Sequence, residues 1–72
     1  MTKNEVIEVG REVIVMLRLK FKPGAIAQVL NEIVSAAMLT RKEVGNIEFQ
    51  VYRAKDDVDR LVLFERWADQ AA

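Results

Sequence analysis

The amino-acid sequence predicts an α+β fold in which one main helix packs on a small antiparallel sheet. Two short apolar strands with a polar turn between them occupy residues 45–67, and apolar side chains recur at helical spacing over residues 25–41. A further run at residues 12–21 is rich in β-branched side chains. The 72 residues form one domain, residues 1–72. A domain of this size buries about 60% of its unfolded surface, so we expect an isolated protomer to be marginally stable.

The N-terminal part of the chain supplies the first strands of the predicted sheet. Residues 12–21 read EVIVMLRLKF and are apolar on both alternating faces near their start, which is typical of a strand covered on both sides. Residues 5–9 form a shorter apolar run that is a candidate strand. Gly10 and Arg11 lie between the two runs and could turn the chain back from one into the other.

Pro23 and Gly24 end the strand at residues 12–21, and an amphipathic helix of about four turns is expected after them. Arg41 and Lys42 suit the negative end of the helix dipole, and Gly45 is a plausible terminator. The apolar positions of the helix, spaced by three and four residues, are Ile26, Val29, Leu30, Ile33, Val34, Ala37 and Met38.

The predicted hairpin consists of strands at residues 46–53 and 60–67. The turn between them carries Asp56, Asp57 and Asp59, whose carboxylates can accept hydrogen bonds from nearby backbone amides. A metal site is the alternative use of these aspartates, but the turn lacks the later glycine and glutamate of a calcium loop, so no metal is expected. After Trp67, residues 68–72 resemble the start of a helix with Asp69 as its cap.

Both faces of the predicted sheet are apolar. In the strand at residues 12–21, Val13, Val15 and Leu17 lie on one face, while Ile14 and Met16 lie on the other. One helix can cover only one face, and a second face left bare would exceed the apolar patch that soluble monomers usually tolerate. We therefore expect a homodimer in which two sheets meet face to face, with the helices outside.

Composition excludes several classes of function. The chain has no cysteine and no histidine, which removes thiol catalysis, thiolate metal sites and the commonest general base. Eleven basic residues balance eleven acidic ones, so no electrostatic case for nucleic-acid binding exists. No stretch approaches the roughly 20 apolar residues of a membrane span, and the first residues lack the pattern of a signal peptide. The expected location is the cytoplasm, with no membrane contact.

The predicted elements carry a pattern that resembles a known family. Residues 13–22 followed by Pro23 and Gly24, the run Val51–Arg53, the acidic turn and the run Glu65–Trp67 occur at the mutual spacing seen in the antibiotic biosynthesis monooxygenase (ABM) family. The resemblance covers about residues 13–70. It implies a ferredoxin-like dimeric α+β barrel. The superfamily includes cofactor-independent oxygenases of quinols or polyketides, haem-degrading enzymes and members with no known reaction, so the fold alone does not settle the function.

The chain departs from this family pattern in two respects. The family continues with a second helix and a fourth strand, whereas this sequence stops in the first turn of that helix, as in a C-terminal truncation. We expect the candidate strand at residues 5–9 to replace the fourth strand, beside the strand at residues 12–21 and antiparallel to it. The haem-degrading branch also needs an asparagine on the first strand and a histidine on the second helix, which have no counterpart here. Haem degradation is therefore disfavoured, and no cofactor is expected.

Five residues are candidates for a site. Glu65 and Tyr52 are the predicted catalytic residues, Glu65 as a base and Tyr52 as a hydrogen-bond donor to a phenolate or quinone oxygen. Trp67, Arg18 and Phe64 are the predicted substrate contacts, with the indole as a wall for a flat aromatic ring. Three of them have a simpler interpretation: Trp67 as a core or interface anchor, Tyr52 as a cap on a sheet face, and Glu65 as the partner of an arginine.

Two functions remain open from the sequence. The first is a cofactor-independent monooxygenase-like protein acting on a small aromatic or quinol, in which the substrate supplies the electrons and the protein desolvates and orients it. The alternative is a non-catalytic homodimer that binds a small hydrophobic ligand or serves as an assembly module. The missing histidine and second helix favour the alternative.

Overall fold

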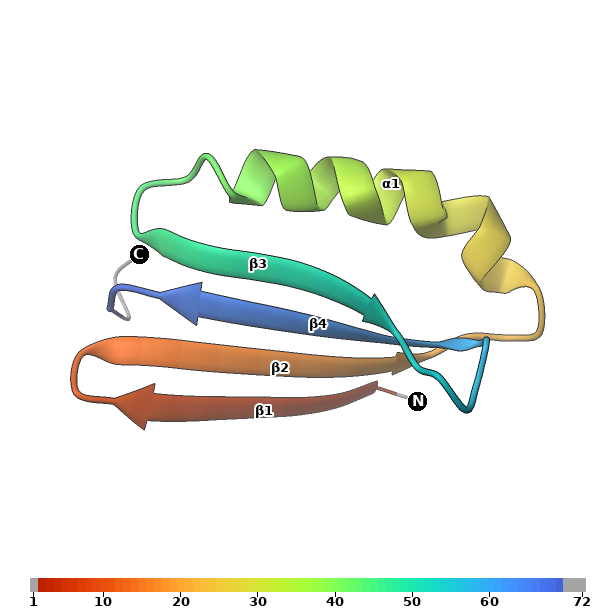
Figure 1. Cartoon of the computed structure of the whole chain (residues 1–72), viewed down its shortest axis with the longest axis horizontal. Coiled ribbons are helices and arrows are strands. Elements are labelled where there is room, and N and C mark those ends of the chain that lie inside the picture. Colours follow the sequence, from red (N-terminus) through yellow and green to blue (C-terminus); the bar gives the residue numbers. More distant parts are fainter. Residues whose placement is uncertain (1, 70–72) are drawn as a thin grey trace.

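The computed structural model describes the backbone of residues 2–69 and the side chains of residues 5–69. Its elements in chain order are β1 (Thr2–Val9), β2 (Glu12–Lys20), α1 (Ala25–Thr40), β3 (Asn46–Arg53) and β4 (Arg60–Trp67). The strands form one antiparallel sheet in the order β1-β2-β4-β3, and α1 runs along the strands on one side of the sheet, next to β3 (Figure 1). The predicted α+β class is confirmed.

Strand β1 fills the edge position beside β2. It pairs antiparallel with β2 from Thr2 opposite Leu19 to Val9 opposite Glu12, which leaves a two-residue connection at residues 10–11. Gly10 has a φ of 64°, a conformation that a residue without a Cβ adopts at little cost and that tight hairpin turns require. The expected N-terminal strand beside residues 12–21 and antiparallel to them is thus confirmed, and it begins earlier than residue 5.

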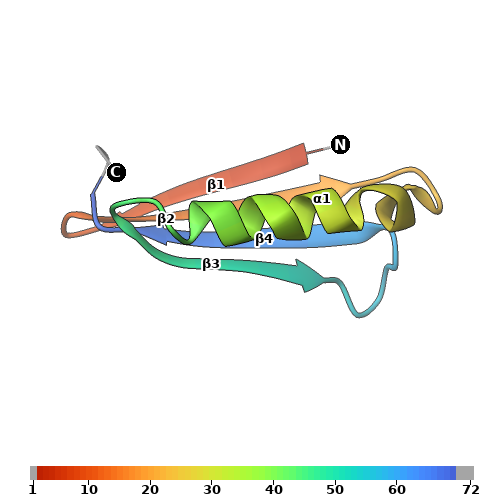
Figure 2. The ribbon, with the colours of Figure 1, turned by 90° about the horizontal axis from the view of Figure 1, so that it is seen from above.

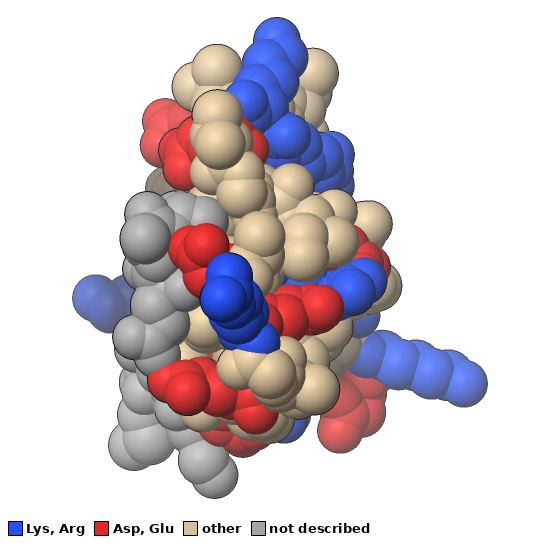
Figure 3. Space-filling model, turned by 90° about the vertical axis from the view of Figure 1, so that its left-hand side faces the viewer, with Lys and Arg blue, Asp and Glu red and all other residues tan. Residues whose placement is uncertain are grey.

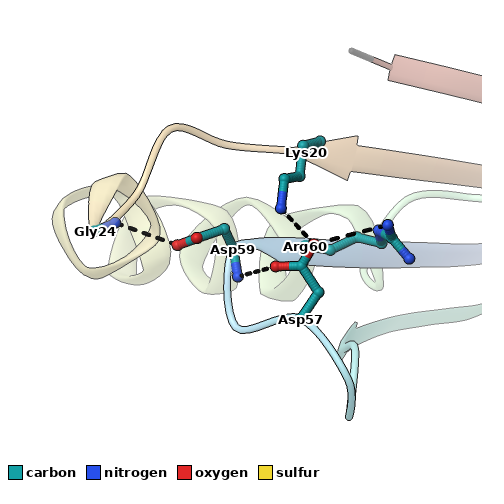
Figure 4. Close-up of polar contacts among 5 residues, drawn as sticks. All are labelled: Lys20, Gly24, Asp57, Asp59 and Arg60. Atoms are coloured by element: carbon teal, nitrogen blue, oxygen red, sulfur yellow. Dashed lines mark hydrogen bonds and ion pairs between the residues drawn. The ribbon is translucent and has the colours of Figure 1, made fainter.

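The acidic turn between β3 and β4 is held against the start of α1 by hydrogen bonds (Figure 4). Gly24, with a φ of 79°, precedes the helix and donates its N–H to Oδ1 of Asp59 at 3.2 Å. The N–H of Asp59 donates in turn to Oδ1 of Asp57 at 2.9 Å, and the N–H of Phe21 donates to the Asp59 carbonyl at 2.8 Å. The predicted bonding of the turn aspartates to backbone amides is confirmed for Asp57 and Asp59.

The core lies between α1 and the sheet. Its buried residues, none more than 9% exposed, are Val13, Phe49 and Leu61 from the strands and Ile26 and Ala37 from the helix. The three strand residues share one face of the sheet through the β2–β4 and β3–β4 registers. We call this the helix-facing side. No described element covers the opposite side, which we call the open face.

The chain bends directly after β4. Residues 68–69 form a bend, and residues 70–72 of the predicted helix lie outside the described part of the chain. The N–H of Ala68 donates to the carbonyl of Gly45 at 2.8 Å, so this bend joins the end of β4 to the start of β3. That hydrogen bond holds the backbone in place beside Trp67.

Candidate functional site

The strand register divides the predicted site residues between the two sides of the sheet. Directly opposite residues in antiparallel strands point to the same face, and Glu65 lies opposite Val15 on β2 and Phe49 on β3. Phe49 belongs to the core, so Glu65 lies on the helix-facing side. Trp67, two residues further along the same strand, shares that side.

The other three predicted residues lie on the open face. Arg18 and Tyr52 are the register partners of Val62 on either side of β4, and Phe64 follows Val62 by two positions. Phe64 and Glu65 are consecutive on one strand, so their side chains point to opposite sides of the sheet. The structure therefore brings Glu65 and Trp67 together and separates them from Arg18, Tyr52 and Phe64.

Glu65 and Trp67 are joined by a direct hydrogen bond. The indole Nε1–H of Trp67 donates to Oε1 of Glu65 at 3.1 Å, and both side chains are partly buried. Among the described side chains, no lysine or arginine lies within ion-pair distance of Glu65, so the arginine partner considered for it is not found. The Glu65 carboxylate is thus a hydrogen-bond acceptor that lies between apolar register partners.

An apolar residue of β1 lies in line with Glu65 across the strands of the sheet. Val6 lies opposite Val15 in register and therefore points to the helix-facing side, yet it is 63% exposed. The reason is the position of the helix, which approaches β3 most closely and leaves β1 outside its cover (Figure 2). Val6, Val15 and Glu65 consequently form a row that runs from solvent to the carboxylate.

The open face has an apolar centre with ion pairs around it. The central side chains, from β2 and β4, are Ile14, Met16, Val62 and Phe64. Beside them the Arg18 guanidinium is bonded to the Glu5 carboxylate, and Tyr52 is 52% exposed. Arg18 is therefore held by a partner within its own chain.

The end of the open face near the β1–β2 turn carries three charged side chains that we call the Arg66 cluster. The Arg66 guanidinium donates to the carboxylate of Glu12 and, at 3.3 Å, to that of Glu48. The hydrogen bond from Arg66 holds the pKa of Glu12 below its ordinary value, and the two carboxylates raise the pKa of Arg66. Figure 3 views this end of the molecule, where acidic and basic side chains are interspersed.

The other end of the open face carries the Asp57 cluster. The ammonium group of Lys20 is bonded to the Asp57 carboxylate, and Nη2 of Arg60 lies 3.7 Å from Oδ2 of the same residue (Figure 4). The hydrogen bonds from Lys20 and from the backbone N–H of Asp59 lower the pKa of Asp57. Lys20 and Arg60 are register partners on β2 and β4, which places both on the open face.

A comparison with protein families identifies the chain. The model of the antibiotic biosynthesis monooxygenase family matches residues 12–72, from the start of β2 onward. The chain belongs to the ABM family. Membership gives it the fold of a monooxygenase-like or small-molecule-binding protein, here with β1 preceding the matched region. Searches of curated proteins and of solved structures return no match.

Among the described residues of this ABM chain, a membrane-spanning helix and a cluster of metal ligands are both absent. No helix among them has the length and apolar character to cross a membrane. No three acidic side chains among them converge as a group of potential metal ligands.

The two charged clusters were not found from the sequence. Arg66 lies 54 positions from Glu12, and only the β2–β4 register brings the two together. A signal does exist, because oppositely charged residues on facing strands stabilise a pairing. Aligning β2 with β4 so that Glu12 comes near Arg66 would have placed the Arg66 cluster, whereas the Asp57 cluster pairs two cationic strand residues with an aspartate of the turn and gives no such signal.

The lowered pKa values predict that the ABM fold loses stability in acid. Glu12 and Asp57 titrate below their ordinary values of 4.5 and 3.8 when folded, so their contribution is complete above those values and is lost as the pH falls through the folded pKa values. We expect the free energy of unfolding to decline below about pH 4.5, and the double variant Glu12→Gln, Asp57→Asn to show a shallower decline. Urea unfolding at several pH values measures it, and identical pH profiles for both chains would contradict the assignment.

Proposed function

We propose that this ABM protein binds a small aromatic molecule with a hydroxyl group, such as a quinol, beside Glu65 and Trp67, and oxidises it as a cofactor-independent monooxygenase. The observation that carries the proposal is the state of the Glu65 carboxylate. It is partly buried between Val15 and Phe49, accepts a hydrogen bond from Trp67 and has no cation at ion-pair distance among the described residues. Such a carboxylate is suited to accept a proton from a phenolic hydroxyl.

The surrounding residues supply binding and orientation. The indole ring of Trp67 offers a flat wall for an aromatic substrate, and Val6 with Val15 offers an apolar floor next to the carboxylate. Deprotonation makes the ring a better electron donor, so the substrate itself supplies the electrons that reduce dioxygen. The protein's contribution is to exclude water from the substrate, to orient it and to take up its proton.

We also propose that two copies of the protein associate through their open faces to form a homodimer. Four apolar side chains at the centre of that face, Ile14, Met16, Val62 and Phe64, lack a covering layer among the described residues. ABM proteins are commonly dimeric, and a second copy of the face would supply that layer. Tyr52, Arg18 and Phe64 then belong to the interface and not to the substrate site, because they lie on the side away from Glu65.

Oxygen consumption with a panel of quinols and dihydroxyaromatics tests the activity. We expect Glu65→Gln to lower the rate by about 10²–10⁴-fold, the usual contribution of a general base, because glutamine keeps the shape but accepts no proton. Glu32→Gln, at an exposed position on α1, is the matched control and should keep the wild-type rate. A Glu65→Gln variant with the full rate would remove Glu65 from the mechanism.

The alternative is a non-catalytic dimer that binds a small ligand. It is favoured by the separation of Tyr52, Arg18 and Phe64 from Glu65, since fewer polar groups then converge on one site. Trp67 is the only tryptophan, so its fluorescence reports binding at the site without labelling. Saturable quenching by a quinol without oxygen uptake would support the alternative, whereas quenching that accompanies uptake and product formation would support the monooxygenase.

A further inference from the structure

We propose that the two copies in the homodimer meet with opposed ends, so that the Arg66 cluster of one protomer lies over the Asp57 cluster of its partner. This inference rests on the proposed homodimer and adds its orientation. The occupant of the open face is a second copy of this chain, and charge complementarity between the two ends of that face carries the argument.

The two clusters differ in net charge. In the Arg66 cluster two carboxylates, Glu12 and Glu48, surround one guanidinium, which leaves a net charge of −1. In the Asp57 cluster two cationic groups share one carboxylate, which leaves a net charge of +1. The open face therefore carries an acidic cluster near one end and a basic cluster near the other.

The clusters are far enough apart to act separately. Arg60 and Arg66 are six residues apart on β4, which corresponds to roughly 20 Å along the strand. The screening length at physiological ionic strength is about 8 Å, so neither cluster neutralises the other within one protomer. Between them lie the apolar centre and the Arg18–Glu5 pair, which is neutral as a unit.

A two-fold axis allows two orientations of the facing sheets, and the cluster charges select between them. A two-fold axis parallel to the strands would place each cluster over its own copy, acidic on acidic and basic on basic. An axis perpendicular to the strands, in the plane between the sheets, places each cluster over the opposite one. Because a two-fold interface repeats every contact, the second orientation gains two complementary contacts, and the first incurs two repulsive ones.

Cross-linking of single-cysteine chains tests the orientation directly, because the natural chain has no cysteine. Arg11 lies in the β1–β2 turn at one end of the sheet, and Lys22 follows β2 at the other end, and both are exposed and outside the clusters. With a bismaleimide that spans about 10 Å, close to the spacing of packed sheets, we expect Arg11→Cys mixed with differently tagged Lys22→Cys to cross-link. Either variant alone should cross-link at least tenfold less.

The outcomes separate this inference from the homodimer itself. Efficient cross-linking of each variant with itself, or a dimeric mass without any cross-link between the two variants, would overturn the opposed-end orientation and leave the homodimer standing. A monomeric mass at micromolar concentration would remove the homodimer and the orientation together.

Reversing the net charge of the clusters by substitution provides a second, independent test. The triple variant Glu12→Lys, Glu48→Lys, Arg66→Glu keeps the ion pairs within the chain but gives both ends a net positive charge, so we expect dimer dissociation to increase at least tenfold at low salt. Adding Lys20→Glu, Asp57→Lys and Arg60→Glu makes the ends opposite again and should restore the wild-type affinity. Failure of this rescue in a chain with wild-type circular dichroism would contradict opposed ends, because only that orientation benefits from the second inversion.

Discussion

Replacing Leu61 by alanine is expected to lower the free energy of unfolding by about 2–5 kcal/mol, the range for removing a buried leucine side chain. Leu61 is 1% exposed and lies on β4, between its register partners Leu19 on β2 and Arg53 on β3. A domain of this length has roughly 4–11 kcal/mol of stability in total, so the loss is a large share of it. Urea unfolding followed by far-ultraviolet circular dichroism measures the change.

The control for Leu61 is a β-branched residue in the adjoining turn. Val58 is 68% exposed, and Val58→Ala should change the free energy of unfolding by less than about 0.5 kcal/mol. Both variants and the wild type must be compared at one protomer concentration, because the proposed dimerisation would add to the apparent stability. A Leu61→Ala loss as small as that of Val58→Ala would mean that α1 does not pack on the sheet as the structure has it.

Replacing Phe64 by aspartate is expected to raise the dissociation constant of the proposed homodimer by at least about 100-fold, which converts it to a monomer at micromolar concentration. Phe64 lies at the apolar centre of the open face, between Met16 and Gln50 in the register. A carboxylate there would be buried in the dimer without a partner, which is far more costly than leaving it in water in the monomer. Light scattering coupled to size-exclusion chromatography measures the molecular mass.

The same charge placed on the other side of the molecule is the control for Phe64. Gln28 is exposed on α1, so Gln28→Asp should leave the dissociation constant unchanged. The Phe64→Asp protomer should keep its fold, since the core lies on the opposite side of the sheet. If Phe64→Asp remains dimeric with the wild-type affinity, the open face is not the interface.

The elements of the fold were predictable because each depends on local chemistry. The β-branched run of β2, the three- and four-residue spacing in α1 and the alternation in β3 are all visible within a few consecutive residues. The turn at Gly10 was visible for the same reason. Even the edge position of β1 followed, because a strand joined by a two-residue turn can pair only with its neighbour.

The site was less predictable because it depends on which strand faces which. Period-two alternation already separates Phe64 from Glu65, but the side of the sheet that each occupies depends on where α1 lies. The register shift between Asn46 and Glu48 also breaks the alternation of β3 and leaves Ile47 48% exposed, although strict alternation would place it on the same face as Phe49. No local pattern marks a shift of this kind.

The helix shows a second property that the sequence does not determine, namely which of its apolar residues are covered. Val34 and Met38 belong to its predicted apolar set, yet they are 43% and 56% exposed. The apolar stripe of α1 is wider than the part of the sheet on which it rests, because the helix lies towards β3. The sequence shows the width of a stripe but not how much of it a neighbouring layer will cover.

The hairpin that forms the β1 edge has a consequence for how the chain reaches its fold. Its contacts join residues at most 17 positions apart, from Thr2 with Leu19 down to Val9 with Glu12. Closing short loops costs little chain entropy, and proteins rich in such near-neighbour contacts fold faster than those whose contacts span the chain. An edge strand from the far end of the polypeptide could pair only after the rest of the sheet had formed. Strands β1 and β2 can instead pair early in folding, and β4 can then pair with β2.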